Sequence, residues 1–284
     1  MLLGILFRTY LYKVVITMRN KKYSVNSPLL KKFIKYIWVI DNKIETEVSH
    51  LLLPVNNIDL ILNFSAPIKY MFKDKKDIVT EEFHLCGLRK YPMKISQKGK
   101  LNVIGISFLP YGLFDFFNIP VSKFTNKTIE LNEISKPLAN VLKEKIEEEE
   151  DEIKKILIIE EELLKILKSN SIVKNDYIDL FNEFISRPDD IKIHNFCQNI
   201  GVSERHLQRL FKKYIGITPK SFSRITRFQR ISKKLLKNDF EKLSTLALEY
   251  QYYDQMHFIR ECKSFSGNTP SKLSKEDLAV KSII

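Results

Sequence analysis

The chain has 284 residues, of which 44% are hydrophobic and 29% charged, a composition typical of globular proteins that bury a core. At this length two domains are the default expectation. Its three cysteines, Cys86, Cys197 and Cys262, lie far apart and form no C-x-x-C pair, which argues against a disulfide framework or a thiolate zinc site and indicates a reducing cytosol.

The net charge of +13 is concentrated in the last third of the chain. From Ile191 onward there are 18 Lys or Arg residues against 8 Asp or Glu residues, so +10 of the total lies there. A basic segment attached to a nearly neutral body predicts a polyanionic partner for that segment, with a merely solvated lysine-rich surface as the alternative.

The opening stretch "MLLGILFRTYLYKVVIT" is apolar but is interrupted by Arg8 and Lys13. It is too short for a transmembrane helix, and it lacks a basic leader and a small-residue cleavage site. We interpret it as an apolar strand or as an extension before a second start at Met18, and expect no membrane association.

Residues 33–129 have the pattern of short strands. The runs "IDLILNF" (58–64), "EFHLCGL" (82–88) and "NVIGISFLP" (102–110) are rich in β-branched and aromatic residues, with Pro, Gly and Asn between them. They predict a small β-barrel or sandwich. His84 and Cys86 share one face of a strand and His50 lies upstream, but the low density of ligands favours a packed strand over a metal site.

Residues 137–168 change to a helical period, with leucine and isoleucine at three- and four-residue spacing between charges. We expect one or two amphipathic helices that pack on their own domain, and pairing with a second subunit is the alternative. The "SNS" at 169–171 is the candidate boundary. The predicted division is a strand-rich domain (1–135), a helical connector (136–170) and a basic C-terminal domain (171–284).

Two similar phrases occur 51 residues apart in the basic segment: "HLQRLFKKYIGITP" from His206 and "HFIRECKSFSGNTP" from His257. Before them, "FCQNIGVSERH" and "LALEYQYYDQMH" each predict a helix with a small residue (Cys197, Ala247), a tight turn and a second helix that begins at a capping Ser203 or Asp254. This is the layout of a helix-turn-helix, present twice.

The second turn contains one more residue than the first, because the offset between copies grows from 50 at Cys197 to 51 at Ser203. Gln251 stands where the first copy has Gly201. If that site needs a positive φ, glutamine costs on the order of 1 kcal/mol there. The alternative is that the extra residue leaves Gln251 helical and moves the bend to Tyr252 or Tyr253; we favour the strained turn.

Between the modules, "PKSFSRITRFQRISKKLL" from Pro219 predicts one helix of about 16 residues, or roughly 24 Å. Two recognition helices on one face of B-DNA should lie about 34 Å apart. A rigid helical spacer therefore makes binding to successive major grooves feasible within one chain.

With the two modules at this spacing, the closing "GITP" and "GNTP" and the "YYDQMHFIRECKSF" of the second module, the chain resembles the AraC family of bacterial transcription regulators over about residues 176–273. The resemblance implies that the helices from Ser203 and Asp254 enter successive major grooves. This chain departs from the family pattern at Gln251, where glycine is common, and at Cys262, where phenylalanine is common.

The N-terminal part is similar to a poorly characterised domain in one branch of that family, through "LLPVNNIDLILNF", "GLRKYPMKI" and "IGISFLPYGLFDFFNIPVSKFTN". That likeness implies a cupin-like or related small barrel with a sensor role. After Pro54, relatives tend to have Asp-Gly where this chain has Asn56 and Asn57.

The residues expected to meet DNA lie at the cap and on the outer side of each second helix: Ser203, Glu204, Arg205, Gln208, Arg209 and Lys212 in the first module, and Asp254, Gln255, Met256, His257 and Arg260 in the second. For the repeated Arg209 and Arg260, a structural brace or a phosphate contact is as reasonable as base reading. The repeated His206 and His257 favour a structural or phosphate-facing role, because no second metal ligand lies at i+3 or i+4 from His206.

We therefore expect an α+β, cytoplasmic, sequence-specific DNA-binding transcription regulator with no cofactor, whose barrel senses a small molecule or mediates assembly. No Gly-rich phosphate loop, Ser-His-Asp order or paired-carboxylate motif favours an enzyme. The alternative is a metal-dependent or methyl-accepting enzymatic domain fused to a DNA-binding tail. The expected partners are double-stranded DNA, RNA polymerase, a small-molecule effector and a second copy through the N-terminal domain or the connector, with no membrane.

Overall fold

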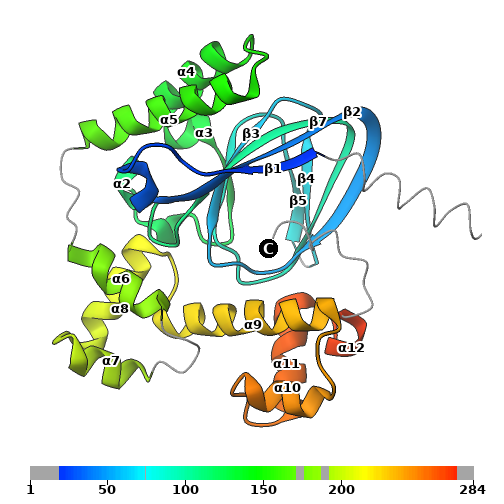
Figure 1. Ribbon diagram of the computed structural model, residues 1–284, viewed down its shortest axis with the longest axis vertical. Coiled ribbons are helices and arrows are strands. Elements are labelled where there is room, and N and C mark those ends of the chain that lie inside the picture. The colour runs from blue at the N-terminus through cyan, green and yellow to red at the C-terminus, as the bar shows by residue number, and fades with distance from the viewer. Residues whose placement is uncertain (1–18, 74, 171–175, 187–191, 274–284) are drawn as a thin grey trace, which may run out of the picture.

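The computed structural model describes residues 19–73, 75–170, 176–186 and 192–273. An N-terminal domain of antiparallel strands, β1–β8, is followed by a helical domain that begins at α6 (Figure 1). The predicted α+β class is confirmed. The apolar opening residues and Ser171 of the predicted boundary at 169–171 lie outside the described residues.

Strand β7 is the central element of the N-terminal domain. Along one edge it pairs with β2 from Ile34↔Phe108 to Leu52↔Met93; along the other it pairs with β4 in its first half and β3 in its second. The sheet curls strongly, but the pairing among the described strands follows an open path, β1-β2-β7-β3-β6-β8, with β4 and β5 branching from β7. The strands are β1 (Arg19–Tyr23), β2 (Ile34–Leu52), β3 (Ile58–Asn63), β4 (Ile68–Phe72), β5 (Lys75–Thr80), β6 (His84–Cys86), β7 (Met93–Phe108) and β8 (Thr128–Glu130).

The curled sheet separates two hydrophobic cores, because successive side chains of a strand point to opposite faces. Ile37 and Val39 belong to the large core that continues into the helices, whereas Trp38 between them packs on a small inner cluster that includes Ile61 and Tyr70. The Trp38 ring lies over Gly105, where an added Cβ would come within 2.0 Å of it. Glycine at this position is therefore required by the close approach of the indole.

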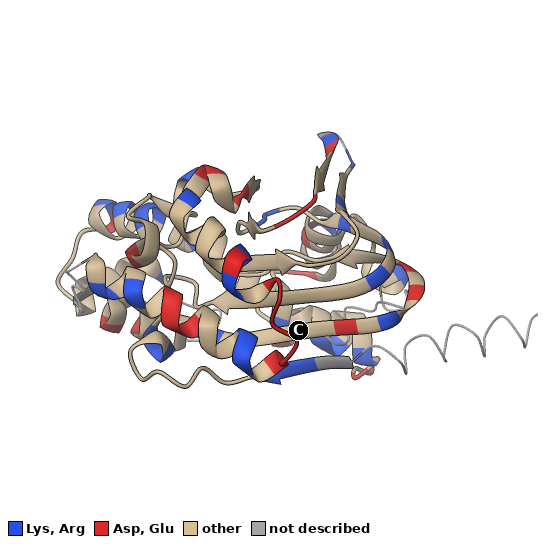
Figure 2. Ribbon diagram, turned by 90° about the horizontal axis from the view of Figure 1, so that it is seen from above, with Lys and Arg blue, Asp and Glu red and all other residues tan. Residues whose placement is uncertain are grey.

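The connector helices α4 (Lys136–Ile146) and α5 (Glu152–Ser169) follow the short α3 (Leu131–Ile134) and pack on the N-terminal domain. In α5 the buried Glu160 carboxylate accepts hydrogen bonds from the backbone N–H groups of Asn26 (3.0 Å) and Ser27 (3.2 Å). Figure 2, which looks down on these helices, shows that both signs of charge occur along them. Part of the predicted apolar stripe, Ile153 and Leu157, is nevertheless exposed.

The helical domain contains the two predicted modules at opposite ends of one long helix, α9 (Figure 1). Its 19 residues correspond to about 28 Å, somewhat longer than predicted. None of the described helices is long and apolar enough to cross a bilayer. The helices are α6 (Asp176–Ser186), α7 (Ile193–Asn199), α8 (Glu204–Tyr214), α9 (Pro219–Lys237), α10 (Leu243–Glu249), α11 (Gln255–Ser266) and α12 (Pro270–Leu273).

The two helix-turn-helix turns share one geometry at the bend. The backbone N–H of Val202 donates to Cys197 (3.0 Å), and that of Tyr252 donates to Ala247 (2.9 Å), so the offset is still 50 at this point. Gly201 has a φ of 68° and Gln251 a φ of 58°. The expected strain at Gln251 is confirmed, and the alternative of a helical Gln251 is wrong. The extra residue of the second turn is Tyr253, between the bend and the cap.

Replacement of Gln251 by glycine should stabilise the protein, because glycine adopts a positive φ without steric cost. The greater entropy of glycine in the unfolded chain opposes this gain, so the net increase in unfolding free energy should stay within about 1 kcal/mol. Thermal and urea unfolding of the full chain measure it. The matched control is Gly201→Ala, which should destabilise by about 1 kcal/mol, since an added Cβ there meets open space and only backbone strain remains. A lower melting temperature for Gln251→Gly would contradict the strained turn.

Candidate nucleic-acid interface

Helix α8 presents its first turns to solvent and buries its other face. The Ser203 hydroxyl caps the helix by accepting a hydrogen bond from the backbone N–H of His206 (3.2 Å). Leu207, Phe211 and Tyr214 are buried. All six candidate residues of this module are exposed: Ser203, Glu204, Arg205, Gln208, Arg209 and Lys212.

Helix α11 repeats this arrangement, with Phe258, Cys262 and Phe265 buried at the positions equivalent to Leu207, Phe211 and Tyr214. The Asp254 carboxylate accepts a hydrogen bond from the backbone N–H of His257 (2.6 Å), and the imidazole of His257 packs edge-on against Tyr252. His257 is therefore half-buried, whereas the other four candidates, Asp254, Gln255, Met256 and Arg260, are exposed. The N-terminal turns of both second helices are thus accessible.

The repeated arginines do not connect helices in the described part of the chain. The guanidinium of Arg209 lies 3.0 Å from Nδ1 of His206 on its own helix, and Arg260 is exposed. Both side chains are thus available for an external partner. His206 has an arginine as its neighbour, and no group of three metal-ligating side chains occurs in the described residues.

The connection between α11 and α9 is made instead by Glu261, which sequence reasoning missed. Its side chain is 3% exposed, and its carboxylate accepts hydrogen bonds from Nε of Arg224 (2.6 Å) and Nη2 of Arg227 (3.2 Å). Arg227 also lies 4.3 Å from the ring centroid of Tyr252 and donates to the Gln251 carbonyl (3.4 Å). The alignment of the two copies could have revealed it, because the charged Glu261 stands at the position of the apolar Leu210 in the first copy.

A buried ion cluster of this kind restricts orientation. Its ions lose hydration that only good mutual geometry can offset, so displacing α11 relative to α9 would leave a buried charge unpaired. The first module has no such cluster on α8; there the rings of Phe184, Phe211 and Phe222 pack together at 4.7 to 6.1 Å. The two recognition helices are therefore held against α9 by different chemistry.

The C-terminal end of α8 packs on the N-terminal domain. Tyr214 contacts Phe114 of α2 (Phe114–Phe117) with ring centroids 4.7 Å apart, and it stacks on Tyr177 of α6 at 3.9 Å. The Thr125 hydroxyl donates to the carbonyl of Gly216 (2.8 Å), where an added Cβ would lie 2.7 Å from that hydroxyl. The same helix thus has one end in solvent and the other in the domain interface.

Asn56 joins the N-terminal domain to α9. Its Nδ2 donates to the carbonyl of Phe222 (3.0 Å) and to the hydroxyl of Thr226 (2.7 Å). Asn56 is buried and follows β2, in the turn where the sequence departs from the pattern of its relatives. The long helix between the modules therefore touches the strand domain directly.

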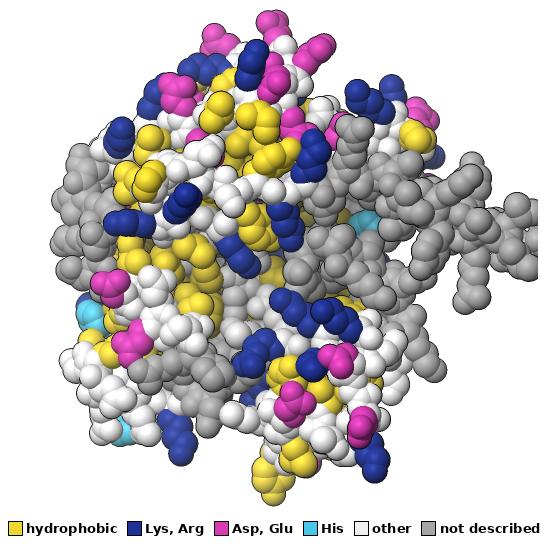
Figure 3. Space-filling model, viewed as in Figure 1, with side chains coloured by type: hydrophobic (Ala, Val, Ile, Leu, Met, Phe, Trp, Pro, Cys, Tyr) yellow, Lys and Arg dark blue, Asp and Glu magenta, His cyan; other side chains and the backbone are white. Residues whose placement is uncertain are grey.

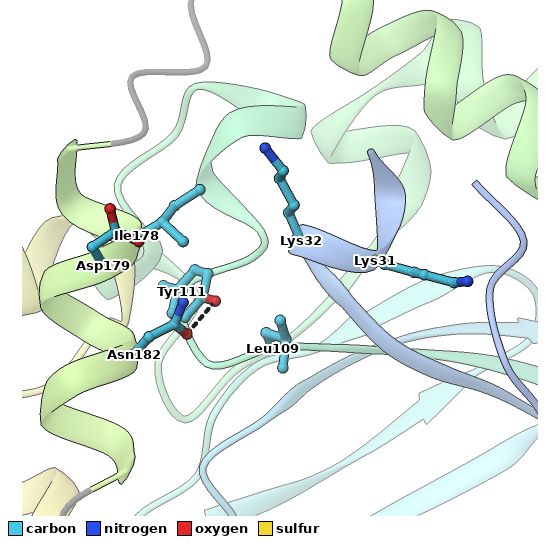
Figure 4. Close-up of a pocket in the computed structure, with 7 residues that line it drawn as sticks. All are labelled: Lys31, Lys32, Leu109, Tyr111, Ile178, Asp179 and Asn182. Atoms are coloured by element: carbon cyan, nitrogen blue, oxygen red, sulfur yellow. Dashed lines mark hydrogen bonds between the residues drawn. The ribbon is translucent and has the colours of Figure 1, made fainter. Parts of the chain in front are cut away.

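A cavity of about 490 Å³ lies between the N-terminal domain and α6 (Figure 4). Its floor contains Tyr111, whose hydroxyl donates to Oδ1 of Asn182 (2.7 Å), and its rim includes Lys31, Lys32 and Asp179. The two lysine side chains point in different directions, so they do not converge on one anion position. The cavity is therefore a gap in the interface between the N-terminal domain and α6, and its rim is polar.

The inner side of the curled sheet contains a buried histidine. Nε2 of His84 lies 2.7 Å from the Tyr70 hydroxyl, and Nδ1 lies 3.0 Å from the Glu82 carbonyl, so both ring nitrogens are already engaged. Burial lowers the pKa of His84 to about 4. Across the interior, burial raises the pKa of Asp59 to about 6 against the hydrogen bonds that it accepts from Ser107 and Asn57.

Arg89 is a buried cation in the same interior. It is 6% exposed, its guanidinium carbon lies 5.0 Å from the ring centroid of Phe72 and 5.9 Å from that of Tyr70, and it donates to the Thr128 hydroxyl. Its Nε has no hydrogen-bond partner, and among the described residues no carboxylate lies within ion-pair distance of it. Burial of a charge without a counter-ion among the described residues is unfavourable.

Two family models match separate parts of the chain. A helix-turn-helix domain family matches residues 196–276, and a domain family of unknown function (DUF6597) matches residues 25–130. "Probable transcription factor PqrA" of Proteus vulgaris is 33% identical over 100 residues, which cover 35% of this chain and 81% of that protein. "HTH-type transcriptional activator AarP" of Providencia stuartii is 26% identical over 94 residues, covering 33% and 69%.

Among solved structures, ToxT from Vibrio cholerae is similar over 83% of this chain and 97% of its own, with 14% identity and a TM-score of 0.42. A TM-score of this size is too low to transfer any property to this chain. Each of the two curated relatives matches about a third of this chain.

The pH dependence of stability should reflect His84 and Asp59 with opposite signs. The folded pKa of His84 is below the unfolded value, so protons bind to the unfolded chain and stability falls as the pH decreases from about 6.5 to 4. The folded pKa of Asp59 is raised, so stability rises as the pH decreases from about 6 to 3.8. Relative to the wild type, Asp59→Asn should lose about 2 kcal/mol more between pH 7 and 4, and His84→Gln should lose less, as measured by urea unfolding. Identical pH dependence in both variants would contradict this.

Proposed function

Because this chain belongs to the AraC family of transcription regulators, we propose that it binds one asymmetric DNA site with α8 and α11 in successive major grooves. Double-stranded DNA is its partner, and regulation of transcription is its activity. The observation that supports the two-groove arrangement is that both capped helix starts are exposed at opposite ends of α9. The length of α9, about 28 Å, is close to the 34 Å of one DNA turn.

Base reading in the first module would come from Arg205, Gln208 and Arg209, since arginine donates two hydrogen bonds to guanine and glutamine pairs with adenine. Lys212, one turn further along the helix, would contact phosphate and contribute affinity without sequence preference. Ser203 and Asp254 would place the positive ends of their helices near the DNA backbone.

We propose the predicted division for the whole chain: a sensor domain (1–135), a connector (136–170) and a DNA-binding domain (171–284). The compartment would be the cytoplasm, where the DNA lies, and RNA polymerase would be a further partner. Ile153 and Leu157 on the connector are exposed apolar residues that a second copy could cover. The enzymatic alternative would need a metal site, but both ring nitrogens of His84 are already hydrogen-bonded.

The effector of the sensor domain would be a small molecule that carries an anionic group. This proposal rests on Arg89, which is buried beside aromatic rings without a carboxylate partner in the described structure. A carboxylate attached to an apolar body would pair with the guanidinium and pack on the inner cluster of Trp38, Ile61 and Tyr70.

The DNA proposal predicts a separation between specificity and affinity. With a site selected from a random DNA pool, Gln208→Ala should lose preference at one or two base pairs, at about 1–3 kcal/mol, because a base contact carries sequence information. Its matched variant, Lys212→Ala, should weaken binding evenly across sequences and reduce the salt dependence. Loss of affinity with unchanged base preference in both variants would contradict the placement of α8.

The effector proposal predicts a signal from Trp38, the chain's single tryptophan. Benzoate should change its fluorescence and raise the melting temperature, whereas neutral benzyl alcohol should do neither, because only the carboxylate pairs with Arg89. Arg89→Met should abolish the response, and Lys94→Met, which removes an exposed charge from the same domain, should retain it. An equal benzoate response in Arg89→Met would show that the anion does not use this site.

A further inference from the structure

The two recognition helices differ in chemistry at equivalent positions. The 51-residue offset aligns Arg205 with Met256 and Gln208 with Ile259, while Arg209 and Arg260 are the same. Positions three and four apart lie on one helix face, so Met256, Ile259 and Arg260 share the face that in α8 contains Arg205, Gln208 and Arg209. Hydrogen-bonding side chains in the first module are thus replaced by apolar ones in the second.

Tyr253 extends this apolar surface. It is the extra residue of the second turn, it directly precedes the Asp254 cap, and it is 88% exposed. The bend is complete at Tyr252, whose backbone N–H closes the turn, so the fold does not use the Tyr253 side chain. An insertion that leaves an aromatic ring in solvent at the start of a recognition helix has no structural role in the described chain.

Exposed large apolar residues are uncommon in the described structure and gather in this module. Three of the eight belong to it: Leu248, Tyr253 and Met256, the last at 59% exposure. Figure 3 shows hydrophobic side chains protruding at the lower tip of the molecule, over α10 and the turn into α11. Single exposed apolar residues need no explanation, but a cluster beside a candidate reading face indicates a partner.

Two exposed cations, Arg260 and Lys263, lie on the same helix as Met256. The module as a whole is balanced, with three Lys or Arg and three Asp or Glu in residues 243–273, so these two cations are the local feature that favours DNA over a protein partner. The edge of a base pair in the major groove offers one apolar group, the C5-methyl of thymine. Apolar side chains next to cations therefore match a thymine flanked by phosphates.

Resting on the proposed DNA binding, we infer that the second module recognises thymine through its methyl group, with Met256 as the main contact and Tyr253 and Ile259 beside it. The first module reads guanine or adenine by hydrogen bonds, so the two half-sites differ in composition. Arg260, an exposed cation on the same face, positions the helix on its half-site through a phosphate contact. The asymmetry fixes the direction in which the chain lies on its DNA site.

The test uses the full chain and its selected site, in which thymines are replaced by deoxyuridine one half-site at a time. Deoxyuridine keeps base pairing and removes only the methyl group. Burial of one methyl is worth about 0.8 kcal/mol, so each contacted thymine should account for about a four-fold loss of affinity. We expect this loss in the half-site whose preference is unaffected by Gln208→Ala, and no loss in the other.

Met256→Gln makes the contact polar at an exposed position, so the fold should be retained and can be verified by the melting temperature. This variant should bind the thymine and deoxyuridine sites equally, whereas Gln208→Ala, the matched control, should keep the wild-type difference. No deoxyuridine effect on the wild type, or the same effect on Met256→Gln, would overturn the inference. Failure to select any preferred sequence would instead overturn the proposed function, so the two failures are distinguishable.

Discussion

The buried carboxylate of Glu261 between Arg224 and Arg227 is the interaction on which the geometry of the second module depends. It connects the middle of α11 to α9, and Arg227 continues the connection to the strained turn through the Gln251 carbonyl. A helix-turn-helix can read a groove only if its second helix is held at one angle. Here that angle is set by charges that cannot be separated without exposing one of them to an apolar environment.

Helix α9 is contacted by both modules and by the N-terminal domain, so it connects all three parts of the molecule. Glu261 binds it from the second module, Phe222 packs with the rings of the first module, and Asn56 binds its backbone from the N-terminal domain. A shift of the turn that contains Asn56 would therefore act on the spacer between the reading helices. The contact of Thr125 with Gly216 provides a second route, at the end of α8. Both contacts begin in the strand domain, where Nε of the buried Arg89 has no hydrogen-bond partner among the described residues.

The two modules are sequence copies that have diverged in how they are held and in what they present. The first is packed by phenylalanines and presents arginine and glutamine; the second is held by ions and presents methionine and tyrosine. Divergence of this kind is accessible because each module contacts α9 independently. Under the proposed DNA binding, a single chain with two different surfaces has no need of a palindromic site, unlike a symmetric dimer.

The elements of the helical domain that depend on residues close together in the chain could be predicted from the sequence. The repeated phrases, the capping Ser203 and Asp254, and the helix from Pro219 depend on residues within a few positions of one another, so their spacing was sufficient. The positive φ at Gln251 also followed from the alignment of two copies. The strand runs around β3 and β6 were recognisable by composition, but their pairing through β7 joins residues far apart in the chain.

Only the tertiary structure could show what depends on such distant pairs. In the sequence, Glu261 is a charged residue at an apolar position. Only the structure shows that it pairs with Arg224 and Arg227, which lie over thirty positions away. The sequence around Arg89 does not distinguish it from an exposed loop arginine, and only the structure shows that its side chain is buried. The contact of Asn56 with α9 spans more than 160 residues. Periodicity and capping report on neighbours along the chain, whereas burial and ion pairing depend on which elements meet, and that is decided by packing of the whole.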